Sequence, residues 1–312
     1  MNTPSQKPSI PPVLGLALGI LAASTASIFI RYAQSYQMPS LVIATYRLVL
    51  ASLVLAPFVL VRYKHELLSL RRRDLALAML AGVFLALHFA TWITSLEYTT
   101  VASSVVLVAT APLWVAIFSP LTIKEPITRL MLVGMSLSLV GGIVVGLSDT
   151  CAWSGGRLAC PSFSEFLHGQ ALLGDLLALV GAIMAGAYLL AGRRVRTSMS
   201  LIPYIFVVYG MAAVVLVVLM LGTGEKPWGY PSMAYLWIIL LALVPQLLGH
   251  TSFNWALRYL SAAFVSISLL GEPIGSSVLA YFLFRESPTI LKLFGAILIL
   301  VGIYTASRGG NS

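Results

Sequence analysis

Ten apolar runs of about 20 residues follow one another along the chain, and they limit its possible folds more than any other feature. Each run is long enough to cross the hydrocarbon core of a bilayer as a helix. The runs are continuous and rich in Leu, Ala, Val and Gly, which is typical of membrane helices rather than of membrane strands. They cover residues 13–33, 39–61, 74–96, 100–122, 128–147, 171–192, 201–221, 233–256, 262–284 and 290–306.

The composition excludes an ordinary soluble protein. Of the 312 residues, 59% are hydrophobic and 9% are charged, whereas soluble domains contain roughly 25% charged residues. The connectors are short, and the first run is predicted to be a retained helix rather than a cleaved signal peptide. The sequence therefore predicts an all-α protein with ten transmembrane helices and no sizeable soluble domain.

The formal net charge of +9 is explained by orientation in the membrane rather than by nucleic-acid binding. Thirteen of the nineteen Lys and Arg residues fall on one side of the predicted topology, five fall on the other, and Arg47 lies inside a run. Cytoplasmic connectors carry the excess of positive charge in membrane proteins. We therefore expect a multi-pass protein of the cell membrane with both termini in the cytoplasm.

An internal repeat appears when the chain is aligned with itself at an offset of 161 residues without a gap. Leu96, Tyr98, Ala102, Pro112, Glu125, Thr128, Gly134 and Gly141 fall on Leu257, Tyr259, Ala263, Pro273, Glu286, Thr289, Gly295 and Gly302. Each copy contains five runs, an odd number, so the second copy must enter the membrane from the opposite side. We expect two inverted units, residues 1–147 and 171–308, joined by an external loop at residues 148–170.

Inverted repeats of this kind are common in secondary transporters, whose binding sites lie near the membrane midplane where the two halves meet. Two equivalent halves can exchange conformations and so open one site to either side. The sequence therefore favours a transporter that works by alternating access.

Two stretches carry a family resemblance: PLWVAIFSPLTIKEPIT from Pro112 and EPIGSSVLAYFLFRESPT from Glu272, each followed by a helix punctuated by glycine. They resemble the EamA-type repeat of the drug/metabolite transporter (DMT) superfamily, and the resemblance covers nearly the whole chain. It implies a ten-helix carrier, commonly an exporter of amino acids and other small metabolites. The longer loop that contains Cys151 and Cys160 departs from the simplest pattern.

These two cysteines are the only ones in the chain. The predicted topology places them outside, where an oxidising compartment favours a disulfide over two free thiols. Their spacing fits no zinc pattern, so no metal site is expected. A phosphate-binding loop, a nucleophile elbow and suitably spaced acid pairs are also missing from the sequence. We therefore expect neither an enzyme nor a cofactor.

Polar residues within the runs are the candidate binding residues. Gln246, His250 and Asn254 recur every four residues and share one face of a helix, and the equivalent run offers His88 and Trp92. Such a face is costly in lipid, so it either lines a central cavity or forms hydrogen bonds between helices. We favour the cavity, because both equivalent runs carry polar or aromatic stripes.

Arg47 lies eight residues beyond Pro39, or about 12 Å along a helix from the outer surface. It could hold a substrate carboxylate. The alternatives are a structural ion pair and a side chain that extends toward the membrane surface, which long basic side chains can do.

Glu272 and Pro273 lie near the middle of the ninth run. An acid at that depth costs roughly 2.5–3.5 kcal/mol on insertion scales and is a functional candidate by default. Pro273 falls on Pro112 in the repeat, so both halves are expected to contain a helix break. Glu272 falls on Ala111, so the shared fold does not require its carboxyl. We expect Glu272 to contact a substrate amine or to exchange a proton, with a structural hydrogen bond between helices as the alternative.

Taken together, these features predict a secondary transporter that exports small neutral or zwitterionic metabolites such as amino acids, with protons as a candidate coupling ion. A carrier of phosphorylated or nucleotide sugars would need several basic residues in the cavity, and the runs supply only Arg47. A membrane scaffold that does not transport is the other alternative. The oligomeric state is left open.

Overall fold

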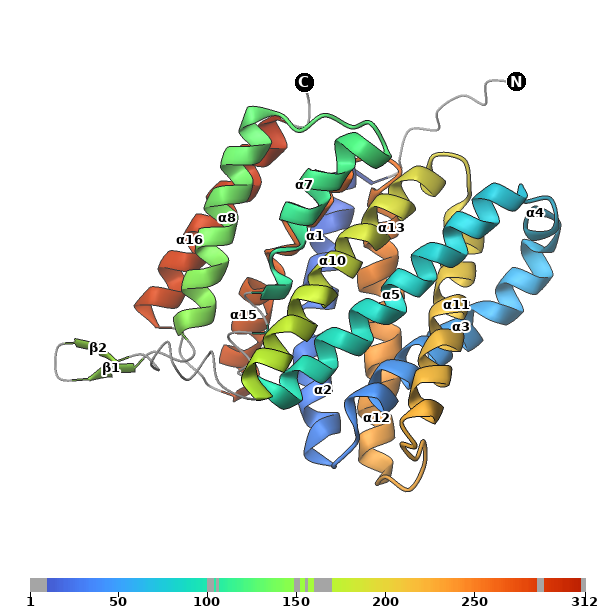
Figure 1. Cartoon of the computed structure of the whole chain (residues 1–312), viewed down its shortest axis with the longest axis horizontal. Coiled ribbons are helices and arrows are strands. Elements are labelled where there is room, and N and C mark those ends of the chain that lie inside the picture. Colours follow the sequence, from blue (N-terminus) through green and yellow to red (C-terminus); the bar gives the residue numbers. More distant parts are fainter. Residues whose placement is uncertain are drawn as a thin grey trace.

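The computed structural model shows a bundle of long helices with one short β-hairpin at its edge (Figure 1). It describes residues 10–99, 104, 107–148, 152–154, 157–159, 170–284 and 289–309. The first helices are α1 (Pro12–Ala23), α2 (Ala26–Ser35), α3 (Ser40–Arg62), α4 (Lys64–Leu68), α5 (Arg72–Tyr98), α7 (Ala111–Thr122) and α8 (Arg129–Ser148). The hairpin strands are β1 (Ala152–Ser154) and β2 (Arg157–Ala159). The remaining helices are α10 (Gln170–Arg196), α11 (Leu201–Gly222), α12 (Ser232–Leu241), the π-helix η1 (Ala242–His250), α13 (Thr251–Ala256), α14 (Ala262–Leu269), α15 (Glu272–Phe284) and α16 (Ile290–Gly309).

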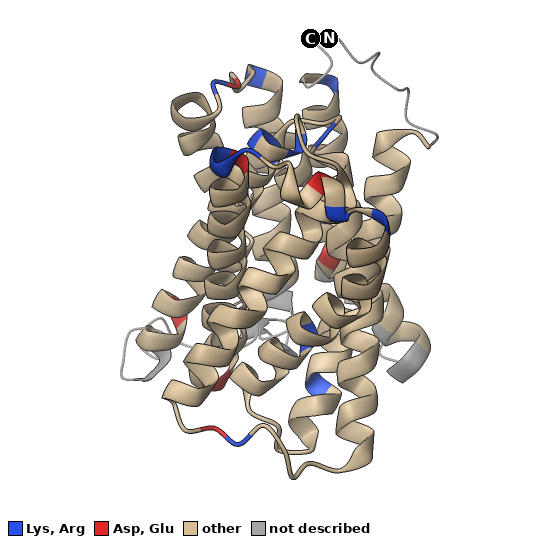
Figure 2. Ribbon diagram, turned by 90° about the vertical axis from the view of Figure 1, so that its right-hand side faces the viewer, with Lys and Arg blue, Asp and Glu red and all other residues tan. Residues whose placement is uncertain are grey.

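Seven helical stretches within the described residues are long and apolar enough to cross a membrane, and three shorter apolar helices accompany them. The expectation of a helical, multi-pass membrane protein is confirmed in this form. Figure 2 shows an almost uncharged body, with most Lys and Arg residues near the end that carries both termini. This distribution is what a membrane-embedded bundle requires, because charge is costly in the hydrocarbon core.

Several of the expected runs are not single straight helices. The first run turns at Ser24–Thr25 between α1 and α2, and the ninth turns at Leu270–Gly271 between α14 and α15. The chain makes an equivalent turn at Ala109–Thr110, just before α7. The eighth run contains the π-helix η1 around Pro245, which cannot donate the regular helical hydrogen bond. The turns before α7 and α15 thus precede Pro112 and Pro273, where helix breaks were expected, whereas the turn at Ser24–Thr25 and the π-helix were not expected.

Helices α8 and α16 pack together with unusually close backbones (Figure 1). A Cβ atom added to Gly134 would lie 2.5 Å from the carbonyl oxygen of Gly302, and one added to Gly141 would lie 2.6 Å from that of Gly295. Sequence numbers rise along one helix as they fall along the other, so the pair is antiparallel. Small residues allow such approach between membrane helices, where packing is the main attraction.

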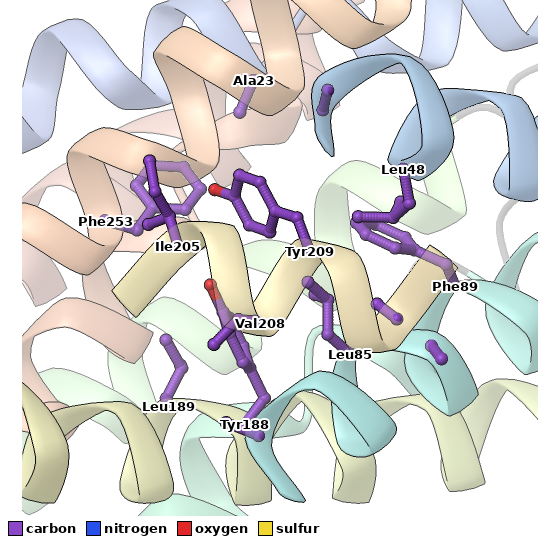
Figure 3. Close-up of a cluster of buried hydrophobic side chains, with 14 of the residues drawn as sticks. Ala23, Leu48, Leu85, Phe89, Tyr188, Leu189, Ile205, Val208, Tyr209 and Phe253 are labelled. Carbon is purple, nitrogen blue, oxygen red and sulfur yellow. The ribbon is translucent and has the colours of Figure 1, made fainter. Parts of the chain in front are cut away.

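The rest of the core joins the two halves of the chain. Helix α5 packs against α10 and α11, α3 packs against α11, and α1 packs against η1. Figure 3 shows part of the buried cluster that results, with Leu85 and Phe89 from α5, Tyr188 and Leu189 from α10, and Val208 from α11. Segments far apart in sequence therefore meet in the middle of the bundle.

The hairpin was not expected from the sequence. Strands β1 and β2 pair antiparallel, with Ala152 opposite Ala159 and Ser154 opposite Arg157. The two cysteines, Cys151 and Cys160, lie outside the described residues.

Candidate functional site

Arg47 is at the centre of a buried polar cluster. Its side chain comes from the middle of α3 and the residue is only 1% exposed. The Nε atom donates a hydrogen bond of 2.7 Å to Oε1 of Gln246 on η1. The guanidinium carbon lies 4.1 Å from the ring centroid of Phe89 on α5, a cation–π contact. The side chain therefore points into the bundle and does not extend toward the membrane surface.

Several polar atoms around Arg47 are buried and have no hydrogen-bond partner among the described residues. They include Nη1 and Nη2 of Arg47, Nε2 of Gln246, Nε1 of Trp92 and Nδ1 of His250. Buried polar groups in proteins are normally satisfied, so each exception calls for an explanation. Most of these atoms are N–H donors, which makes the cluster suited to a ligand that supplies acceptors.

Aromatic rings form one wall of the cluster. The ring of His250 meets the rings of Phe89 and Phe253 at centroid distances of 5.3 and 5.2 Å. His88 and Trp92 stack at 5.7 Å, and Nδ1 of His88 donates to the carbonyl oxygen of Gly181 at 2.9 Å. The carbonyl can only accept, so this bond assigns the proton to Nδ1.

Asn254 belongs to a second hydrogen-bond network one turn further along. Its Oδ1 accepts from the Tyr188 hydroxyl at 2.8 Å, and its Nδ2 donates to the carbonyl oxygen of His250 at 2.8 Å. Nδ2 also lies 3.4 Å from the hydroxyl of Tyr209, which is 3.2 Å from that of Thr251. Figure 3 shows both tyrosines within the apolar core, so the network is sealed from lipid.

Glu272 is the first residue of α15, directly after the turn at Leu270–Gly271. Glu272 is half-buried, and its carboxyl interacts electrostatically with the Arg47 guanidinium. The start of a helix is favourable for a carboxylate, and Pro273 is well placed in the first turn. Pro112 has the corresponding place in the first turn of α7.

The turn before Glu272 contacts the turn in the first run. The Ser24 hydroxyl donates to the backbone oxygen of Glu272 at 3.0 Å, and the Ser276 hydroxyl donates to the backbone oxygen of Ser24 at 2.8 Å. Backbone groups freed by a break in a membrane helix need such partners. These hydroxyls fix the position of Glu272 relative to the first run.

All seven predicted binding residues can be located in the structure. Arg47, Gln246, His250, His88 and Trp92 come together around Phe89, while Asn254 lies in the adjoining network and Glu272 at the start of α15. The residues that sequence reasoning missed are Phe89, Tyr188 and Tyr209, which carry no signal in an apolar run. Pro245 was a visible signal for the π-helix, and short π-helical segments are frequent at functional sites.

A network of charged residues closes the end of the bundle that carries the termini. Glu125 Oε1 lies 2.5 Å from Nε of Arg193, whose Nη1 donates to the carbonyl oxygen of Leu257 at 2.7 Å. The other oxygen of Glu125 accepts from the backbone nitrogen of Ala262 at 3.3 Å. These partners lie on α10 and at the start of α14, so Glu125 joins segments that are distant in the sequence.

At the opposite end, two carboxylates face the start of α3. Glu97 Oε1 accepts from the backbone nitrogen of Ser40 at 3.3 Å. Burial raises the pKa of Glu225, the nearby Glu97 carboxylate adds to this effect, and a hydrogen bond from the Val42 backbone opposes it. The Glu225 carboxyl is therefore easier to protonate than an ordinary surface acid.

An apolar pocket of about 400 Å³ lies apart from this cluster, between α15 and the α8–α16 pair. Its lining includes Ile274, Val278, Phe282 and Leu293, and none of the predicted binding residues. Phe282 is 66% exposed on the outer side of the bundle. The pocket is therefore a feature of the outer surface and is separate from the buried polar cluster. No group of three or more His, Cys, Asp or Glu residues within the described ranges could hold a metal ion.

Comparison with known proteins identifies the family. The model of the EamA-like transporter family matches residues 10–147 and again residues 172–308. The chain belongs to the EamA-like transporter family. The family points to transport rather than to enzymatic catalysis, and it agrees with the resemblance seen in the sequence.

Individual proteins similar to this chain share modest identity with it. An uncharacterized transporter of Bacillus subtilis, YdfC, is 25% identical over 264 residues, covering 84% of this chain and 79% of that protein. The pseudopaline exporter CntI of Pseudomonas aeruginosa is 22% identical over 297 residues, covering 94% of this chain and 96% of that protein.

A solved crystal structure is similar with a TM-score of 0.77 at 15% sequence identity, covering 96% of this chain and 97% of that one. This likeness extends to the whole fold.

Proposed function

We propose that the protein is a secondary transporter that exports small neutral or zwitterionic metabolites, such as amino acids, by alternating access. The observation that carries the proposal is the polar cluster around Arg47 inside an otherwise apolar bundle. Ionisable residues at this depth commonly mark the route of a substrate or ion. Membership of a transporter family supports the activity, and the name of the exporter CntI supports the direction.

The proposal includes an architecture of ten membrane helices in two inverted five-helix units, residues 1–147 and 171–308, with residues 148–170 as an external loop and both termini in the cytoplasm. The α8–α16 pair supports it. Gly134 faces Gly302 and Gly141 faces Gly295, so each glycine meets the repeat equivalent of the other. A two-fold axis between inverted halves produces such reciprocal contacts, and the double match to the family model agrees with it.

Glu272 is proposed to contact a substrate amine or to exchange a proton during turnover. Its half-buried position, the nearby Arg47 and the break before α15 support this role. A carboxyl that is alternately occupied by substrate and by a proton would couple export to the proton gradient.

The test is flux in proteoliposomes loaded with a panel of labelled amino acids, sugar phosphates and nucleotide sugars. We expect protein-dependent efflux of at least one amino acid, with a rate that changes with pH in the wild type. Glu272→Gln keeps the size of the side chain but removes titration, so it should abolish that pH dependence while the yield of folded protein stays unchanged. Glu97→Gln is the matched control, because Glu97 is exposed at the far end of α5.

The outcomes separate the alternatives. Efflux of sugar phosphates in place of amino acids would overturn the substrate class, and a lack of flux across the whole panel would favour a scaffold. A wild-type pH profile in Glu272→Gln would remove Glu272 from the mechanism.

A further inference from the structure

Three buried donors next to each other are left without acceptors in the middle of the bundle. Nη1 and Nη2 of Arg47 and Nε2 of Gln246 are all buried and have no partner among the described residues. The guanidinium is always charged, and a charged donor without a hydrogen-bond acceptor in a low-dielectric interior is strongly unfavourable, even with the Glu272 carboxyl close enough to act on its charge. A stable protein keeps such a group only where a further molecule supplies the missing hydrogen-bond acceptors.

The two side chains are held so that these donors keep a fixed direction. The third donor nitrogen of Arg47, Nε, is already bonded to Oε1 of Gln246 at 2.7 Å, which fixes the orientation of the Gln246 amide. The amide nitrogen lies near the Tyr209 hydroxyl but does not reach hydrogen-bond geometry with it. The Phe89 ring covers one face of the guanidinium at 4.1 Å. Both residues are at most 1% exposed, so little freedom is lost when a ligand binds.

We propose that Nη1 and Nη2 of Arg47, together with Nε2 of Gln246, bind the carboxylate group of the transported molecule. This inference rests on the proposed function and specifies which atoms recognise the substrate. Two parallel N–H groups of a guanidinium match the two oxygens of a carboxylate in geometry and in charge, and such bidentate pairs are among the strongest hydrogen bonds in proteins. The amide nitrogen adds a third donor to one of those oxygens.

Glu272 defines what else the substrate must carry. Its carboxyl interacts with Arg47, so an anion entering the site also meets a negative neighbour. A molecule with an ammonium group next to its carboxylate satisfies both side chains, whereas a simple acid satisfies only Arg47. The site therefore selects zwitterions such as α-amino acids over monocarboxylates, and it disfavours phosphate esters, whose second negative charge has no partner here.

The experiment measures binding on purified full-length protein, so it does not depend on transport. The probes are leucine, acetate and benzoate, each compared with its own amide (leucinamide, acetamide and benzamide), with sodium chloride at matched ionic strength. Ligand binding to the folded state raises the melting temperature by mass action. We expect each acid to stabilise the wild type more than its amide does, leucine to act at a concentration at least tenfold lower than acetate, and chloride to have no effect.

Two variants test the residues. Gln246→Glu places a carboxylate where the amide now accepts from Arg47, so the fold should be retained while the internal acid occupies the guanidinium and removes the difference between acids and amides. Glu272→Gln should bring the concentrations at which leucine and acetate stabilise the protein closer together, because the anion no longer meets a negatively charged neighbour. Thr94→Ser, a mild change at a half-buried position two residues beyond Trp92 on α5, is the control and should bind like the wild type.

The proposal is overturned if wild-type protein responds equally to acids and amides or to none of the probes, if chloride replaces the acids, or if folded Gln246→Glu keeps the full preference for acids. Failure of transport is distinguishable. Protein that prefers acids but moves no substrate in proteoliposomes contradicts the transporter proposal alone, and flux that amides inhibit as well as acids contradicts the carboxylate site alone.

Discussion

Replacing Gly134 by alanine should separate α8 from α16, and the structure gives the size of the effect. A Cβ atom at Gly134 would lie 2.5 Å from Gly302 O, 2.6 Å from Ala306 N and 2.8 Å from Ala306 Cβ, where ordinary contacts are 3.4–4 Å. Two of these atoms belong to the backbone and cannot rotate away. The helices must therefore move apart by roughly 0.9 Å, and a gap of about that size forfeits a quarter to a half of the attraction between facing atoms.

We expect Gly134→Ala to destabilise the protein by about 1–3 kcal/mol, the usual cost of overpacking. Gly142→Ala is the matched control in the same helix, because its nearest neighbour would be Ala109 Cβ at 4.0 Å. That substitution should be neutral, or stabilising by up to about 1 kcal/mol, since alanine is the better helix former. The measurement is thermal unfolding in detergent, with both variants purified side by side.

A second substitution at the same crossing sharpens the test. A Cβ atom at Gly302 would meet Gly134 O at 2.5 Å, so it requires the same separation of the helices. The double variant Gly134→Ala/Gly302→Ala should therefore cost less than the sum of the two single changes. If Gly134→Ala melts at or above the temperature of Gly142→Ala, or if the two costs add in full, the close packing of α8 and α16 is refuted.

Two further predictions concern Glu225 and the two cysteines. Because burial and Glu97 raise the pKa of Glu225 in the folded protein, its ionisation removes stability as the pH rises from the unfolded pKa through the folded one. Glu225→Gln should therefore melt higher than the wild type at pH 7, with a gain that shrinks toward about pH 4; a gain that grows on acidification would contradict this sign. Cys151 and Cys160 are predicted to form a disulfide, which the pairing of Ala152 with Ala159 supports. Maleimide should then label neither cysteine without reductant and both after reduction, and full labelling of untreated protein would rule the disulfide out.

The membrane class and the candidate residues could be predicted from sequence because their signals are local. Hydropathy identifies apolar runs, and a charged residue such as Arg47 or Glu272 is conspicuous within one. The interruptions of the helices were only partly visible. Proline indicated the breaks near Pro112 and Pro273, but the turn at Ser24–Thr25 has no proline and is held by hydrogen bonds with α15, one from the Ser276 hydroxyl and one to the Glu272 backbone oxygen.

The partners of the candidate residues could not be predicted, because they are contacts between distant segments. Nothing in the sequence pairs Arg47 with Gln246, which lies 199 residues away, and Phe89 is one aromatic residue among many in apolar runs. Glu125 illustrates the same point. It lies a few residues before α8 in the sequence, whereas its ion-pair partner, Arg193, is 68 residues distant. The local sequence pattern therefore identifies the candidate residues, whereas their contact partners depend on tertiary packing.

The proposed two-fold relation explains why the cluster lies where it does and why it is asymmetric. Phe89 and His250 are 161 positions apart, and their rings touch at 5.3 Å, as equivalent residues do only beside a two-fold axis. At the same offset, Arg47 and Gln246 correspond to Val208 and Leu85, which are fully buried in the apolar core of Figure 3. The same place in the scaffold is thus polar in one copy and apolar in the other. In the proposed transporter, a symmetric frame would allow the site to open to either side, and charge placed on one copy alone would give the bound molecule a fixed orientation within it.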